Sequence, residues 1–153
     1  MGKYGKCSLG DLKKFRNELE KLQDSDEFIE SCAKELAARL LRMVIKATPV
    51  GQYSSSTGKT GGTLRKGWTD SKNKSAQGYA NSLDVQKNGG SYVIDIINPI
   101  EYASYVEYGH RTANHKGWVK GQFMMTISEQ ELEKITPRIL ENKIDKYLRG
   151  CFK

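Results

Sequence analysis

Residues 92–112 read YVIDIINPIEYASYVEYGHRT, and the rest of the chain is expected to be organised around them. Its first half holds a β-branched run, Val93–Ile97, which is too short for a helix and ends at an Asn-Pro pair. Such a run predicts a buried strand. Asn98 can then cap a helix, and Pro99 suits the first helical position because its φ angle is already fixed. We therefore expect a short helix from about Pro99 to Tyr108.

This predicted helix carries three of the chain's eight tyrosines, Tyr102, Tyr105 and Tyr108. A helix this short cannot bury three phenol rings beneath itself. Part of their area should therefore meet another element or another chain. The sequence leaves open the alternative that the tyrosines simply complete the core.

Length and composition indicate one domain with a modest core. The chain has 153 residues, of which 37% are apolar and 28% charged, so its surface could be completed by neighbouring chains. The formal charge of +7 lies mostly on predicted loops in the middle of the chain. Three cysteines without metal-ligand spacing, no signal peptide and no membrane-length apolar run indicate a soluble protein made in a reducing compartment.

Three longer helices follow from apolar residues at helical spacing. The first runs from about Asp11 to Gln23. The second begins at residue 24 or 25 and runs to Ala47, and Cys32 lies on its apolar stripe as a packing residue. The last, Phe123–Cys151, is expected to bend at Pro137 or to divide there into two helices in tandem.

Between these helices the sequence predicts a small sheet. Residues 63–69 read as a strand, and residues 82–97 read as a β-hairpin that turns at Asn-Gly-Gly, residues 88–90. The expected fold class is α+β: a small antiparallel sheet of about three to four strands packed against a long N-terminal helix, with a short central helix and a long C-terminal helix.

Two polar segments, residues 50–62 and 110–122, hold few apolar side chains and are expected to be mobile loops. The first contains Gly-Lys-Thr, but a phosphate-binding loop would need glycine where Tyr53 stands. In the second, His110 and His115 lack a third metal ligand. No cofactor and no metal are expected.

Glu107 and His110 could be written as an acid/base pair of a hydrolase. The sequence offers no accompanying nucleophile or recognisable pocket, so a surface contact is the better interpretation.

Four short motifs occur in a characteristic order: TPVG at 48–51, TLR at 63–65, YASYVEYG at 102–109 and GQFM at 121–124. Together they resemble the minor tail component family of tailed bacteriophages and prophages, which includes tail-completion and head-to-tail joining proteins. The resemblance covers roughly residues 25–150 and leaves residues 11–23 without a counterpart. Gln122 stands where the family usually carries an arginine.

The resemblance implies a single domain, with residues 1–24 as a helical extension and residues 25–153 as the tail-component part. It implies a structural virion protein that is not an enzyme and that forms a ring where the tail meets the head. The implied partners are copies of itself, the tail tube or tail terminator, and the head connector. The implied location is the tail or neck of the virion, after assembly in the cytoplasm of the bacterial host.

The expected subunit or partner interface gathers the central aromatic residues and their basic neighbours: Tyr102, Tyr105, Tyr108, Arg111 and Trp118. The alternative interpretation is a small basic module that binds nucleic acid without sequence preference through charge and stacking. Its candidate DNA-facing residues are Lys59, Arg65, Lys66, Lys72 and Lys74, near Trp68 and Tyr79. The two interpretations overlap, because a ring around DNA could turn basic loops toward its lumen. Neither involves a membrane.

Overall fold

The computed structural model describes residue 17 and residues 25–70 and 74–151. The expected first helix, residues 11–23, lies outside this part of the chain apart from residue 17. The elements are, in order, α2 (Ser25–Ala47), the 3₁₀ helix η1 (Ser55–Thr57), α3 (Thr63–Gly67), α4 (Ala76–Ser82), β1 (Gln86–Asn88), β2 (Ser91–Val93), α5 (Ala103–Tyr108), β3 (Gly109–Arg111), β4 (Trp118–Lys120) and α6 (Met124–Cys151). The predicted α+β class is confirmed. None of the described helices is long and apolar enough to cross a membrane.

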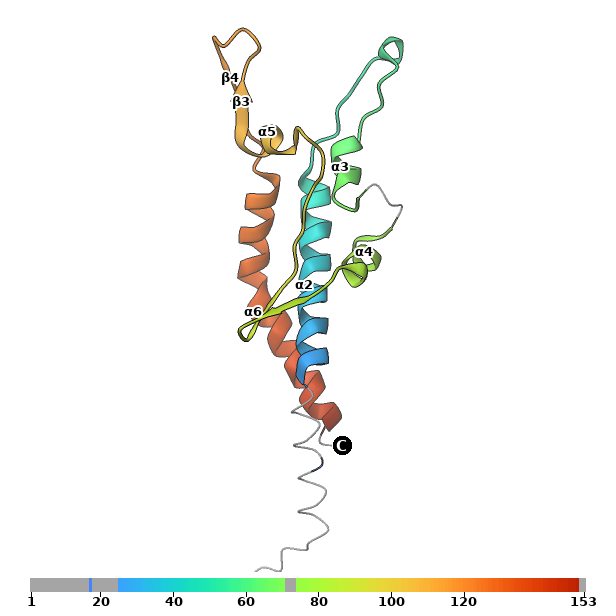
Figure 1. Ribbon diagram of the computed structural model, residues 1–153, viewed down its shortest axis with the longest axis vertical. Coiled ribbons are helices and arrows are strands. Elements are labelled where there is room, and N and C mark those ends of the chain that lie inside the picture. The colour runs from blue at the N-terminus through green and yellow to red at the C-terminus, as the bar shows by residue number, and fades with distance from the viewer. Residues whose placement is uncertain (1–16, 18–24, 71–73, 152–153) are drawn as a thin grey trace, which may run out of the picture.

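The frame of the molecule is the antiparallel pair of long helices, α2 and α6 (Figure 1). Near the start of α2, the rings of Phe28 and Tyr147 stack with their centroids 4.2 Å apart. One turn further, Lys143 Nζ lies 3.1 Å from a carboxylate oxygen of Glu35 and donates to the Ser31 carbonyl. The pair is therefore held by an aromatic stack and a partly exposed ion pair as well as by its apolar stripes.

The C-terminal helix α6 is continuous and contains Pro137, so the expectation of one long helix is confirmed. Proline cannot donate the backbone hydrogen bond of its turn. In the same turn the Thr136 hydroxyl donates to the Leu132 carbonyl, a bond that favours bending. The axis of α6 changes direction along its length (Figure 1).

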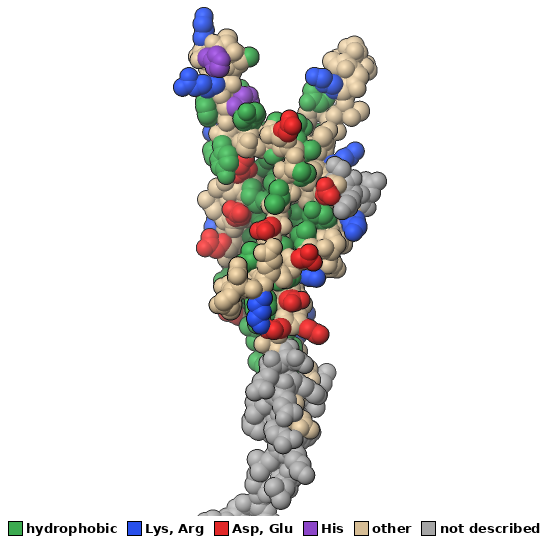
Figure 2. All heavy atoms as spheres, viewed as in Figure 1, with side chains coloured by type: hydrophobic (Ala, Val, Ile, Leu, Met, Phe, Trp, Pro, Cys, Tyr) green, Lys and Arg blue, Asp and Glu red, His purple; other side chains and the backbone are tan. Residues whose placement is uncertain are grey.

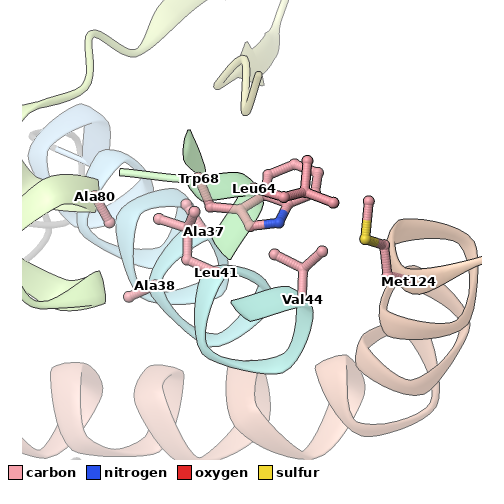
Figure 3. Close-up of a cluster of buried hydrophobic side chains, with 8 residues drawn as sticks. All are labelled: Ala37, Ala38, Leu41, Val44, Leu64, Trp68, Ala80 and Met124. Atoms are coloured by element: carbon pink, nitrogen blue, oxygen red, sulfur yellow. The ribbon is translucent and has the colours of Figure 1, made fainter. Parts of the chain in front are cut away.

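The core is small and lies where α2, α3, α4 and α6 meet (Figure 3). Thr48, directly after α2, is buried and joins two of these helices. Its hydroxyl accepts a hydrogen bond from Trp68 Nε1 at 2.7 Å, and its carbonyl accepts one from Arg65. Cys32 is buried as predicted, and burial raises the pKa of its thiol.

Residues 63–69 were expected to form a strand, and this prediction is wrong because α3 occupies them. Leu64 and Trp68 are four residues apart, a spacing that places two side chains on one face of a strand and equally of a helix. Both are buried in the core beside α2. Gly67 is also buried, and a Cβ there would lie 2.2 Å from Asn98 Oδ1, so α3 needs glycine at this contact.

The hairpin expected within residues 82–97 is confirmed, with shorter strands than expected. β1 and β2 pair antiparallel around Gly89 and Gly90, both at positive φ. After β2 the extended segment 94–98 is not part of either sheet. Ile94 and Ile96 face the core, whereas Ile97 is 67% exposed, so the predicted buried strand is wrong for this segment. Instead of one sheet there are two separate two-stranded sheets.

The second sheet corrects the expectation of an open loop at residues 110–122. β3 and β4 pair antiparallel, with Arg111 opposite Trp118. The tip is closed by Thr112, whose N–H donates to the Gly117 carbonyl and whose hydroxyl accepts from the Gly117 N–H. This polar hairpin is held by turn chemistry rather than by an apolar face.

Replacing Leu41 by alanine should destabilise the protein by about 2–5 kcal/mol, because Leu41 is fully buried and its loss leaves a cavity. Urea unfolding followed by circular dichroism measures the change. Leu148→Ala is the matched control, since Leu148 is 37% exposed on α6, and its cost should stay below about 1 kcal/mol. Equal losses in the two variants would contradict the assigned core.

Candidate assembly surface

Glu107, near the end of α5, caps the start of α6. Its carboxylate accepts hydrogen bonds from the Met125 N–H at 2.9 Å, the Thr126 N–H at 2.9 Å and the Thr126 hydroxyl at 2.7 Å. The first amides of a helix have no partner within the helix and carry partial positive charge. The buried carboxylate satisfies both needs, so α5 is fastened to the long helix.

The backbone around this cap reinforces the joint. The Phe123 N–H donates to the Glu107 carbonyl at 3.0 Å, and the Gln122 N–H donates to the Val106 carbonyl at 2.7 Å. Phe123 has a φ of 49° and, being apolar, offers no capping oxygen of its own. The side chain of Gln122 is exposed, so the joint is made without the arginine that the resembled family usually carries there.

Two glycines allow the backbones to approach closely at this joint. A Cβ on Gly121 would lie 2.3 Å from the Glu107 carbonyl oxygen, and one on Gly109 would lie 2.4 Å from the Val119 carbonyl oxygen. Gly109 also has a φ of 86°, which side-chain-bearing residues rarely adopt. Both positions therefore require glycine.

The structure contradicts both interpretations of Glu107 and His110: the surface contact and the acid/base pair of a hydrolase. Glu107 is buried and its carboxylate is occupied by α6. Within the described residues, His110 Nδ1 is buried without a hydrogen-bond partner. The imidazole ring instead lies against Tyr105, with their centroids 5.6 Å apart.

Asn98 sets the position of α5. Its side-chain oxygen accepts from the Ile100 N–H, and its side-chain nitrogen donates to the Leu64 carbonyl in α3 at 2.8 Å. This local turn occupies the residues expected to form the first helical turn. The helix therefore begins at Ala103 rather than near Pro99, and its aromatic residues stand at the edge of the core.

The three tyrosines of this region are exposed: Tyr102 by 44%, Tyr105 by 58% and Tyr108 by 65%. They do not complete the core of the subunit, so that alternative is wrong. Tyr102 lines a cleft of about 230 Å³ together with Tyr53 of the 50–62 segment. Tyr108 lines a second cleft, which we call the groove, and Tyr105 lies against the β3–β4 hairpin.

The other two predicted interface residues lie on that hairpin. Arg111 and Trp118 are directly opposite each other in the β3–β4 register, so their side chains share one face. Trp118 is 62% exposed. The five predicted residues thus lie directly before α5, in α5 and in the hairpin that follows it; their role as an interface stays a prediction.

The groove has a volume of about 260 Å³ and is largely apolar, with Ile96, Ile97, Tyr108, Met124 and Met125 among its lining residues. Ile97 was not predicted as a site residue, because the whole β-branched run was expected to be buried. The polar Asp95 between two isoleucines was a signal of alternating faces.

The candidate DNA-facing residues do not form one stacking surface. Lys59 is exposed in the 50–62 segment, with its Nζ 5.9 Å from the ring centroid of Tyr53. Lys66 and Lys74 are exposed. Arg65 donates a hydrogen bond to the Thr48 carbonyl, and Lys72 lies outside the described residues.

The two aromatic residues near these cations are not free to stack on bases. Trp68 is buried and Tyr79 packs on the core. The aromatic partners expected for bases are therefore occupied within the fold.

The two arms define the shape of this end of the molecule. The 50–62 segment and the β3–β4 hairpin rise from the same end of the helix pair, with α5 between their bases (Figure 1). Exposed aromatic residues on and between two projecting arms are typical of surfaces that take part in protein–protein assembly.

Comparison with protein families identifies the chain. A family model described as "Bacteriophage HK97-gp10, putative tail-component" matches residues 13–109. The match covers more than half of the chain, so the chain belongs to the HK97-gp10-like family of phage tail components, and the predicted family is confirmed. It is accordingly a structural tail protein, and family membership implies a location in the virion.

The matched region differs in extent from the predicted resemblance. It begins at residue 13, within the expected first helix, and ends at Gly109, before the GQFM motif. Comparisons with curated proteins and with solved structures gave no match.

Replacing Glu107 by alanine should destabilise the protein by about 2–4 kcal/mol, because charge-assisted bonds are lost and two amides of α6 lose their partner. Chemical denaturation followed by circular dichroism measures this loss. The control is Glu129→Ala, an exposed acid of the same helix, whose cost should be below about 0.5 kcal/mol. A Glu107 variant as stable as the control would show that the cap is dispensable.

Proposed function

We propose that this tail component is a tail-completion or neck protein that forms a ring of identical subunits at the junction of tail and head. Its role there is structural, and it catalyses no reaction. The observation that carries the proposal is the exposed aromatic surface of Tyr102, Tyr105, Tyr108 and Trp118 on and beside α5. Membership of a phage tail-component family supports it.

The exposed aromatic area is large enough to favour a role in assembly over permanent exposure to solvent. An aromatic side chain buries about 150–250 Å² when it is enclosed, whereas a standard protein interface buries about 800 Å² on each partner. Tyr105, Tyr108 and Trp118 would therefore supply a large share of one interface. These residue types also dominate the binding energy of interfaces.

The arrangement of the surface favours a head-to-tail contact. The groove lies on the body of the subunit, and the β3–β4 hairpin projects beyond it (Figure 1). Contacts between unlike surfaces repeat from copy to copy and close into a ring when the rotation allows. The two arms would then be free to contact the tail tube or terminator on one side and the head connector on the other.

The exposed 50–62 arm suits a contact that orders on docking. Every residue from 51 to 61 is exposed, and apart from η1 the segment has no regular structure. A polar arm of this kind gains partners for its backbone only when another chain covers it. Assembly would thus be coupled to the arrival of the partner.

The double variant Tyr105→Ala/Tyr108→Ala should weaken self-assembly by tenfold or more while leaving the unfolding midpoint unchanged, because both rings are exposed in the subunit. Native mass spectrometry over a concentration series measures assembly as discrete multiples of 17.2 kDa. Ile144→Ala/Leu148→Ala, which removes exposed apolar side chains near the far end of α6, is the control. A wild-type protein that remains monomeric at all concentrations would refute the ring.

A further inference from the structure

The β3–β4 hairpin carries positive charge and no acid. Between Glu107 and Glu129 the sequence contains Arg111, Lys116 and Lys120 and no Asp or Glu. All three cations are exposed, and none belongs to an ion pair found among the described residues. Figure 2 shows Lys, Arg and His side chains gathered on this arm, above the body of the molecule.

The register of the hairpin concentrates this charge around Trp118. Arg111 lies opposite Trp118, and Lys120 is two residues further along the same strand. Side chains two apart on a strand share a face, as do directly opposed residues. One face of the hairpin therefore presents an exposed indole between two cations, while His110 and Val119 occupy the other face.

The segment that precedes the hairpin carries the opposite pattern. From residue 88 to residue 110 the sequence contains Asp95, Glu101 and the buried Glu107 and no Lys or Arg. Asp95 and Glu101 are exposed, and neither has an ion-pair partner within the part of the chain that the structure describes. Acidic side chains are visible on the body below the two arms (Figure 2).

Neither acid is among the residues that line the groove, but both stand next to lining residues in the sequence. Asp95 directly precedes Ile96, the first of the extended-segment residues that line it, and Glu101 lies in the turn between the lining residues Asn98 and Ala103. The largely apolar groove therefore has two exposed carboxylates close to its lining residues along the chain. An apolar surface with nearby negative charge is complementary to the hairpin face, which presents an indole beside two positive charges.

We propose that the hairpin of one copy docks on the groove of the next copy, with Trp118 against the apolar lining and Arg111 and Lys120 facing Asp95 and Glu101. The inference rests on the proposed self-assembling function and specifies its interface. No residue of β3 or β4 lines the groove of its own subunit, so we take the occupant to be the hairpin of a second copy. Each copy supplies one hairpin and one groove, as a head-to-tail contact requires.

The charges favour this occupant over nucleic acid. A DNA strand would be attracted by the cations of the hairpin and repelled by the carboxylates beside the groove. A partner that presents an aromatic group together with positive charge complements the groove and its neighbouring acids, and the hairpin is such a partner. Complementary charge across an interface also rejects wrong partners and fixes the register of docking.

The test uses two charge-reversed forms of the full-length protein. The hairpin-reversed variant is Arg111→Glu/Lys120→Glu, and the groove-reversed variant is Asp95→Lys/Glu101→Lys. Each alone places like charges at every contact and should assemble at least tenfold more weakly than the wild type. In an equimolar mixture every contact between unlike copies regains opposite charges, so assembly should recover to within about threefold. Native mass spectrometry with one variant isotope-labelled should then show equal numbers of the two variants in each assembly, as alternation requires.

The control variants Glu133→Lys and Lys134→Glu reverse exposed charges of α6 and should assemble like the wild type. Trp118→Ala should weaken assembly without any change of charge. Unchanged unfolding midpoints show that the variants are folded, as expected for exposed positions.

Three outcomes would overturn the inference. If the wild type assembles and both reversed variants assemble equally well, the pairing is wrong although the ring stands. If the hairpin-reversed variant assembles like the wild type but no longer binds double-stranded DNA that the wild type binds, the hairpin contacts nucleic acid. If the wild type never assembles, the proposed function fails together with the inference.

Discussion

The carboxylate of Glu107 at the N-terminus of α6 is the contact on which the upper half of the molecule depends. The apolar core lies among α2, α3, α4 and α6, and α5 contacts it through the partly buried Ala103 and Val106, whereas the residues of β4 are exposed. The hydrogen bonds of this cap therefore stabilise the region of α5 and the hairpin, as buried apolar contacts stabilise the core. It uses a buried charge whose cost is offset by three hydrogen bonds and by the partial positive charge of the helix terminus.

Because contacts other than the tyrosine side chains hold α5 in place, aromatic side chains can remain at the surface of a stable subunit. α5 is held by its backbone, by Glu107 and by Ala103 and Val106 against the core, and its tyrosines stand exposed. The close backbone approaches at Gly109 and Gly121 serve the same end, since they fix the hairpin without using side chains. The result is a firmly positioned platform whose outer side chains are available to partners.

The long elements were predictable from the sequence because each carries its own signal. α2 and α6 follow from apolar periodicity over many turns, and the β1–β2 hairpin follows from its Asn-Gly-Gly turn. The errors arose where a local pattern fits two structures. Leu64 and Trp68, four residues apart, suit a strand or a helix, and only their packing beside α2 decides for α3.

The candidate site was predictable in its residues but not in its architecture. The clustered tyrosines predicted an aromatic surface, and the order of the motifs predicted the family. The role of Glu107 was hidden because its partners lie 18 and 19 residues away. An indirect signal existed: α6 begins after Gln122-Phe123 without a Ser, Thr, Asp or Asn at its start, so a helix of this length needed a cap from another element.

The contrasting positions of the two tryptophans have a practical consequence. Trp68 is sealed in the core and bonded to Thr48, whereas Trp118 stands in solvent on the hairpin. Their indoles should consequently emit at different wavelengths and differ in their access to a dissolved quencher such as iodide. The native chain thus contains one optical reporter of its interior and another of its periphery, and no dye has to be attached to follow either.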